Sequence, residues 1–197
     1  MIKNRNGVIV AAVSTLTALL SILYITSCQR VKPDNPYKCN YVYCQNGGKC
    51  DSAKCKCPVG YEGTDCGTAT RTKFLGVWSV RAYVQGSDSA ALVGTETVYD
   101  VDLRESSSNT TFMMHNFDNN PYYNNIICRI DSLDKALFGF DTTNPLNMYY
   151  DHYRIRQGSW CRIQSAGQMV GQINVRRLNA TSNWQNDTLL ITAYKKK

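Results

Sequence analysis

The sequence predicts a mainly β protein, in which a small disulfide-rich module precedes an antiparallel β-barrel or sandwich. Two observations predict this fold class. Six of the nine cysteines fall within residues 39–66. Alternation of apolar and polar residues with period two recurs through residues 71–197, where no helical apolar stripe is found. Cysteine at this density also indicates an oxidising compartment outside the cytosol.

Residues 1–27 have the basic and apolar zones of an export signal. Lys3 and Arg5 precede an apolar run over residues 8–25, which ends in Ile25-Thr26-Ser27-Cys28. This tetrapeptide resembles a lipobox. The resemblance implies that the Cys28 thiol receives a diacylglyceryl group and that a peptidase cuts before Cys28. The alternative is an uncleaved transmembrane anchor, because about 18 apolar residues approach the spanning minimum.

Residues 28–38 form a lipidated tether in this interpretation. The segment carries Pro33, Pro36 and several polar residues, which is the composition of a linker. Removal of residues 1–27 leaves 20 basic against 15 acidic residues, and Lys195, Lys196 and Lys197 supply three of the basic ones. The remaining body is nearly neutral, so the sequence predicts no nucleic-acid partner. We expect the membrane, reached through lipid on Cys28, and an unknown protein or glycan as partners.

The module over residues 39–66 has too few apolar residues for a core of its own and needs disulfides to fold. Six cysteines allow 15 pairings, and spacing alone does not choose among them. The segments 44–50 (CQNGGKC) and 55–66 (CKCPVGYEGTDC) resemble the motifs of an EGF-like domain. The resemblance implies the pairs Cys39–Cys50, Cys44–Cys55 and Cys57–Cys66. A zinc ribbon is disfavoured by the lack of paired C-x2-C knuckles, and calcium by the lack of an acidic cluster before Cys39.

Residues 71–197 are predicted to contain about nine short strands. Trp78, Val80, Ala82 and Val84 alternate with polar residues or tyrosine, and further strands are expected at 99–104, 110–117, 125–130, 136–140, 148–156, 160–164, 169–177 and 188–194. The start of this region, Gly76-Val77-Trp78, resembles the G-x-W opening of lipocalin-like barrels, in which the tryptophan closes the barrel floor. The remaining cysteines, Cys128 and Cys161, are expected to pair in an oxidising compartment; two buried free thiols are the alternative.

The whole arrangement resembles surface lipoproteins of Bacteroidota-type bacteria. That resemblance implies a location in the bacterial cell envelope, and we expect the outer membrane. Triplets of Asp, then Ser or Thr, then a small, aliphatic or Thr residue resemble the O-glycosylation motif of the same bacterial group. Their candidate acceptors are Ser52, Ser89, Ser132, Thr142 and Thr188.

The sequence predicts no enzyme, cofactor or metal site. Only two histidines are present. A metal site at His115, His152 and Asp151 is disfavoured, the serines at 106–108 are typical of a loop, and no phosphate-binding motif occurs. The sequence therefore favours a non-enzymatic, lipid-anchored binding or adhesion module. The alternative is a lipocalin-like carrier that binds a small apolar ligand inside the barrel.

Overall fold

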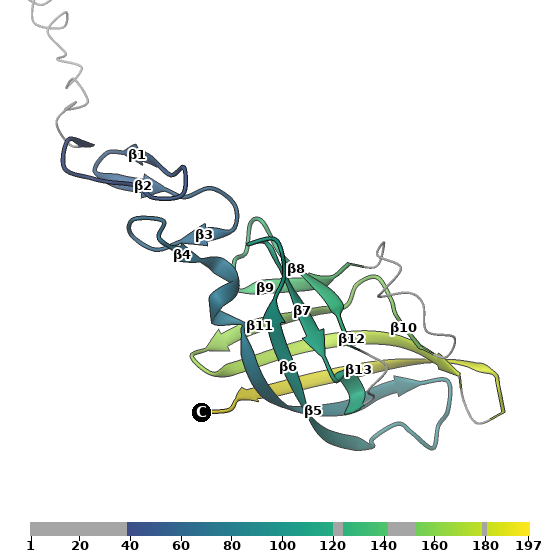
Figure 1. Ribbon diagram of the computed structural model, residues 1–197. Helices are drawn as coiled ribbons and strands as arrows, with labels where there is room; N and C mark the ends of the chain where they lie inside the picture. The colour runs from purple at the N-terminus through teal and green to yellow at the C-terminus, as the bar shows by residue number, and fades with distance from the viewer. Residues whose placement is uncertain (1–38, 120–123, 142–152, 179–180) are drawn as a thin grey trace, which may run out of the picture.

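The computed structural model describes residues 39–119, 124–141, 153–178 and 181–197, and these form a disulfide-rich module followed by a β-barrel (Figure 1). The predicted signal peptide, the tether with Cys28, and Thr142 lie outside the described residues. No helix in the described ranges is long and apolar enough to cross a membrane. The strands are β1 (Lys49–Asp51), β2 (Lys54–Lys56), β3 (Tyr61–Glu62), β4 (Thr68–Ala69), β5 (Gly76–Ser87), β6 (Glu96–Glu105), β7 (Thr111–His115), β8 (Ile126–Ile130), β9 (Leu137–Phe140), β10 (Tyr153–Ile155), β11 (Trp160–Ser165), β12 (Gln168–Leu178) and β13 (Trp184–Lys195).

The disulfide module, residues 39–69, consists of two small antiparallel hairpins, β1–β2 and β3–β4. Its three disulfides join Cys39 to Cys50, Cys44 to Cys55 and Cys57 to Cys66. These are the pairs that the EGF-like resemblance implies. Its exposed tyrosines, Tyr41 and Tyr43, show that the cross-links replace a hydrophobic core of its own.

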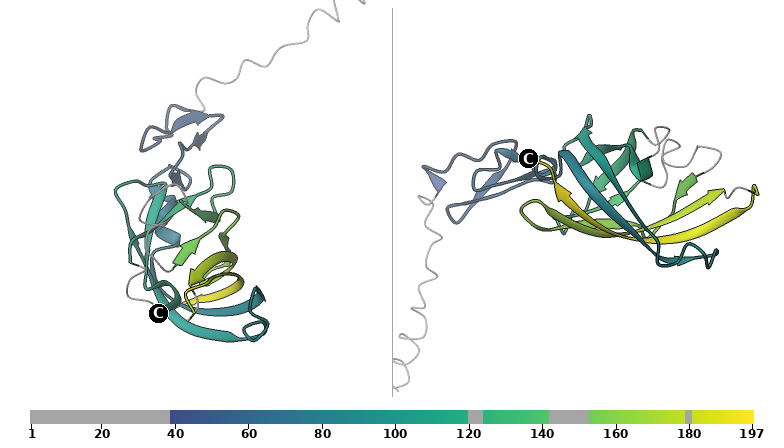
Figure 2. Two further views of the ribbon diagram at one scale, coloured as in Figure 1. Left: turned by 90° about the vertical axis from the view of Figure 1, so that its right-hand side faces the viewer. Right: turned by 90° about the horizontal axis from the view of Figure 1, so that it is seen from below.

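An eight-strand antiparallel barrel forms the larger body, seen from two further sides in Figure 2. The strand order is β12-β11-β9-β8-β7-β6-β5-β13, and the pairing of β13 with β12 closes the ring. Closure decides between the two predicted architectures in favour of the barrel. β10 pairs with the part of β12 that β11 leaves free, so β10 and β11 share one edge of β12.

The barrel core follows the predicted alternation. Trp78, Val80, Ala82 and Val84 on β5 are buried, whereas Arg81 and Tyr83 face outward. At the end beside the disulfide module, the rings of Phe74, Phe112 and Phe138 lie 4.9–5.4 Å apart between centroids. Trp78 is fully buried there and its Nε1 donates a hydrogen bond to Phe74 O at 2.7 Å. This position matches the expected role of the tryptophan as the floor of the barrel.

The opposite, distal end of the barrel is polar inside. Gln185 and Asp187 are buried on the inward face of β13, and Asp187 is paired with Arg177 of β12. Asp118 lies beside the same arginine, with Oδ2 3.8 Å from Arg177 Nη1. β13 begins at Trp184, four residues before the start predicted from the sequence at Thr188. The prediction missed these residues because the inward positions of this part of the strand are polar.

Cys128 and Cys161 are not joined, in contrast to the sequence prediction; both are free and buried. The strand order gives the reason. Cys128 on β8 pairs in register with Phe140, and Cys161 on β11 with Phe138, so β9 lies between them. Strands two places apart are separated by about 9.5 Å, whereas a disulfide needs Cα atoms within about 7 Å. Burial raises the pKa of both thiols well above the ordinary value.

Candidate functional site: the groove between module and barrel

The disulfide module is hydrogen-bonded to the barrel through Tyr61. Asn109 Nδ2 donates to the Tyr61 hydroxyl at 2.5 Å, and Lys135 Nζ donates to the Tyr61 carbonyl oxygen at 2.6 Å. Gly60, with φ of +92°, fits closely here: a Cβ at this position would lie 3.2 Å from Asn109 Cβ. These contacts fix the loop before Tyr61 against the barrel wall.

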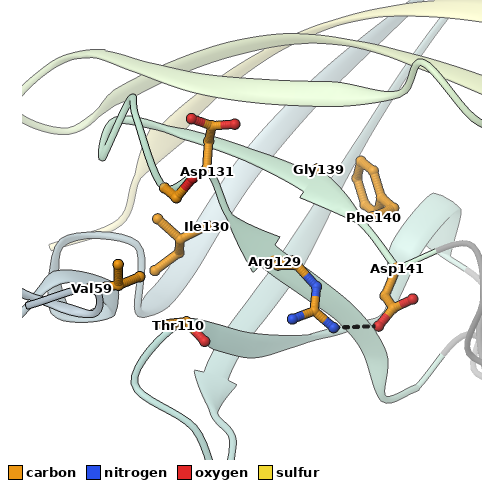
Figure 3. A pocket seen from close by; sticks show the side chains of 9 residues that line it. Val59, Thr110, Arg129, Ile130, Asp131, Gly139, Phe140 and Asp141 are labelled. Carbon is orange, nitrogen blue, oxygen red and sulfur yellow. Dashed lines mark hydrogen bonds and ion pairs between the residues drawn. The ribbon is translucent and has the colours of Figure 1, made fainter.

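A groove of about 600 Å³ runs beside this contact, and both parts of the chain build it (Figure 3). Val59 of the disulfide module forms one wall and is 61% exposed. The barrel supplies the remainder from the residue before β7, from β8, from the β8–β9 turn, from β9 and from the residue after β9. These barrel residues are Thr110, Arg129, Ile130, Asp131, Ser132, Gly139, Phe140 and Asp141.

The register of the sheet explains why a groove forms on this strand face. Gly139 of β9 lies between Arg129 of β8 and Trp160 of β11, directly opposite each across its strand pair. With no side chain at Gly139, the outer surface is low between these neighbours. Trp160 is 39% exposed.

Three charged side chains line the groove, with a net charge of about −1 if all are ionised. Arg129 Nη2 lies 2.9 Å from Asp141 Oδ2. Asp131 Oδ1 accepts the backbone N–H groups of Asp134 and Leu133 at 2.7 and 2.8 Å, which holds the pKa of Asp131 below its ordinary value. The groove therefore presents a polar, weakly acidic surface with one apolar wall.

This chemistry suits binding. The carboxylate of Asp131 is engaged in a turn, and that of Asp141 forms an ion pair with Arg129. No cluster of three or more His, Cys, Asp or Glu residues able to hold a metal occurs among the described residues. His115, one of the metal candidates weighed from sequence, is half-buried on β7 opposite Asp102, and burial lowers its pKa; His152 and Asp151 lie outside the described residues.

The candidate glycosylation residues do not gather at one place. Ser52 and Ser132 are exposed on tight turns, and Ser132 lines the groove. Ser89 is half-buried in the loop after β5. Thr188 lies within β13, where its Oγ1 donates to Asn174 Oδ1 at 3.2 Å. Ser52 and Ser132 are therefore the most accessible acceptors among the described residues.

One void inside the barrel is small. The void lined by Tyr99, Phe117, Met169 and their neighbours measures about 10 Å³, which is room for about one water molecule. A carrier of small apolar ligands needs a chamber of several hundred Å³. This void is too small to hold such a ligand, while the barrel fold itself is compatible with a lipocalin-like binding module.

Two sets of surface residues were missed by reasoning from the sequence. The groove residues Arg129 and Asp141 are far from Val59 in sequence, and no local pattern links them. The second set consists of Arg154, Arg156 and Arg176, which lie near one another on the barrel surface. Its signal in the sequence is the spacing of Arg154 and Arg156, because residues two apart on a strand share one face.

Comparison with known protein families finds no family model that matches this chain, and comparison with curated proteins finds no match either.

Proposed function

We propose that this protein is a non-enzymatic, lipid-anchored binding protein of the bacterial cell envelope, in the outer membrane. It is tethered through Cys28 and binds a protein or glycan partner at the groove between the disulfide module and the barrel. The observation that carries this proposal is the construction of the groove: Val59 and the β8–β9 surface form it together, beside the hydrogen bonds of Tyr61.

The anchor is supported by the lipobox-like tetrapeptide ending at Cys28. Two acyl chains on one cysteine hold a protein stably on a membrane, since each buried methylene contributes about 0.8 kcal/mol. Expression of the full chain and of Cys28→Ala in a Gram-negative host, followed by membrane fractionation and intact mass, tests the anchor. We expect the lipid mass and membrane partition to vanish in Cys28→Ala and to persist in Cys128→Ala. Membrane retention of a processed chain without lipid would contradict it.

The groove is tested by filling it. At Gly139 a Cβ would meet Ser159 O at 3.6 Å, an ordinary contact, so Gly139→Gln adds a side chain over the groove without disturbing the strand. The readout is binding of the full-length protein to an array of bacterial and host glycans and to intact cells. We expect Gly139→Gln to lower binding at least tenfold.

The control is Val98→Gln, because Val98 lies on β6 outside both proposed sites and is 62% exposed. Binding by Val98→Gln is expected to equal that of the unmodified protein. Equal binding by all three proteins would place the recognition surface elsewhere and overturn the assignment of the groove.

A further inference from the structure

The pairing of arginines singles out one surface of the barrel. Most arginines of the described ranges lie within 4 Å of a carboxylate: Arg71, Arg81, Arg104, Arg129, Arg162 and Arg177. The three others in those ranges, Arg154, Arg156 and Arg176, have no such ion pair with any described residue. These three lie together on the outer face of β10 and β12, so their charge is concentrated.

Strand register fixes their arrangement. Arg154 of β10 lies directly opposite Arg176 of β12, and Arg176 lies opposite Asn186 of β13. Arg156 follows β10, and its backbone N–H donates to Asn174 O at 2.8 Å, which continues the pairing. Arg154 and Arg156 are two residues apart, so their side chains share a face about 7 Å apart. We call Arg154, Arg156 and Arg176 the arginine face.

The arginine face is held in shape by an aromatic ring. Cζ of Arg154 and of Arg176 lie 5.2 and 4.9 Å from the centroid of the Trp184 ring. This contact uses the face of each guanidinium and leaves N–H groups at its edge for hydrogen bonds. Arg156 is oriented separately, since its Nη1 donates to Asn186 Oδ1 at 3.0 Å.

Neutral donors and acceptors adjoin these charges. A hollow of about 300 Å³ is lined by Arg156, Gln157, Asn174, Asn186 and Thr188, among others. Two carboxylates adjoin them. Asp187 lines the hollow and is paired with Arg177, and Asp88 accepts hydrogen bonds from the backbone N–H and Nδ2 of Asn186, both at 2.8 Å. Because Arg177 offsets Asp187, the three guanidinium groups against Asp88 leave a net charge of about +2.

We propose that the arginine face is a second binding site, distinct from the groove, and that it takes an acidic polysaccharide through the sulfate or carboxylate groups of its sugars. A guanidinium edge donates two parallel hydrogen bonds to such a group. The amides of Gln157, Asn174 and Asn186 donate to and accept from sugar hydroxyls. The surface lies on β10, β12 and β13 at the end of the barrel away from the disulfide module (Figure 1).

The same surface suits other polyanions less well. Single-stranded nucleic acid needs free aromatic faces for its bases, and Trp184 is already covered by two guanidinium groups. Duplex DNA is read by an element that enters a groove, whereas this surface is a sheet face. An acidic peptide binds most strongly where an apolar anchor fits a pocket, and the hollow is lined mainly by polar side chains.

The test is titration of the full-length protein with dextran sulfate and with uncharged dextran of the same length. We expect the sulfated polymer alone to bind, with an affinity that falls as salt rises. Arg154→Gln/Arg176→Gln is expected to lower affinity at least tenfold, and Arg154→Lys/Arg176→Lys, which keeps the charge but not the bidentate edge, by an intermediate factor. Polygalacturonate in place of dextran sulfate distinguishes carboxylate from sulfate as the preferred group.

Controls separate this site from general attraction of polyanions. Arg81→Gln/Arg104→Gln removes two outward arginines that are ion-paired, and Gly139→Gln blocks only the groove. Both variants should therefore bind dextran sulfate as the unmodified protein does.

Circular dichroism verifies folding of each variant. If Arg154→Gln/Arg176→Gln fails to fold, the single change Arg156→Gln, at an exposed residue, replaces it. Equal loss in the Arg81 and Arg104 control, unchanged binding by the arginine-face variants, or tighter binding of polyglutamate or duplex DNA at the same salt would each overturn the proposal.

Discussion

Arg177 Nε lies 2.5 Å from Asp187 Oδ2 inside the distal end of the barrel, where the Asp187 side chain is fully buried and that of Arg177 is 27% exposed. Removing the cation leaves a buried carboxylate without its counter-charge, hydrogen-bonded to the neutral amide of Gln185, whose Nε2 donates to Asp187 Oδ1 at 2.9 Å. We expect Arg177→Met to lower the free energy of unfolding by about 2–3 kcal/mol, less than for a fully buried pair because Arg177 reaches solvent. Urea denaturation with intact disulfides measures this loss.

A double variant separates the ion pair from the packing of Arg177. Arg177→Met/Asp187→Asn removes both charges of this pair and should recover part of the loss, because the fully buried carboxylate of Asp187 is then gone; Asp118 is the same in both variants. The exposed pair Arg104–Asp102 is the control, and Arg104→Met should cost less than about 1 kcal/mol. A loss in the double variant as large as in Arg177→Met would show that packing dominates.

Asp118 and Asp131 predict opposite dependences of stability on pH. Burial raises the pKa of Asp118 above its ordinary value, against the opposing effect of Arg177. The folded state then holds the proton longer, so the contribution of Asp118 to stability falls as pH rises from about 3.8 through the raised pKa. Asp118→Asn should therefore gain stability relative to the unmodified protein between pH 4 and pH 7; asparagine also tolerates the φ of +57° at this position.

Asp131 has the reverse sign. Backbone N–H groups of Asp134 and Leu133 lower the pKa of Asp131, so its contribution is present above the ordinary pKa and is lost as pH falls through the lowered one. Asp131→Asn should be less stable than the unmodified protein at pH 7, with a difference that shrinks in acid. Urea midpoints at four pH values between 3 and 7 measure both variants, and parallel curves for the two would contradict the assignment.

The two free thiols predict a specific mass pattern. After denaturation without reductant and alkylation with iodoacetamide, the peptides that contain Cys128 and Cys161 should each carry one adduct, while the six module cysteines carry none. In the native protein both thiols should resist alkylation, because burial keeps them protonated. A peptide pair linked through these two cysteines would show that the barrel rearranges enough to join them.

Most of the barrel could be predicted from alternation, because each strand has one face toward a packed core. The polar start of β13 could not, since Gln185 and Asp187 have the composition of a loop and are buried only through Ser87 and Arg177. The pairing of Cys128 with Cys161 failed for a related reason: strand order is a tertiary property, and β9 separates them. The arginine face could not be predicted from the net charge. The charge of the whole body is nearly neutral, yet three arginines without an ion pair to any described residue lie on one surface.

Gly171 of β12 is predicted to tolerate no side chain. A Cβ there would collide with Trp160 O and would lie 2.6 Å from Cys161 Sγ. Since backbone is one of the two neighbours, Gly171→Ala should cost about 2–3 kcal/mol through displacement of β11. Gly86→Ala, in open space on β5, should change stability by less than about 0.5 kcal/mol. Thermal unfolding of the two variants compares them directly.

The side chains that hold Tyr61 and Glu62 predict that the disulfide module and the barrel tumble as one body. Asn109 and Lys135 donate to Tyr61, and Lys73 Nζ lies 2.8 Å from Glu62 Oε2. Asn109→Ala/Lys135→Met/Lys73→Met removes these contacts while leaving both cores intact. ¹⁵N relaxation should give one rotational correlation time for the unmodified protein and a shorter one for the disulfide module of the triple variant.

The control is Lys49→Met/Lys54→Met, on the far hairpin β1–β2, which should keep the single rotational correlation time. If the triple variant also tumbles as one body, the backbone link from Gly60 O to Thr70 N, at 2.9 Å, is enough to couple the two parts, and the groove does not depend on Tyr61 for its shape.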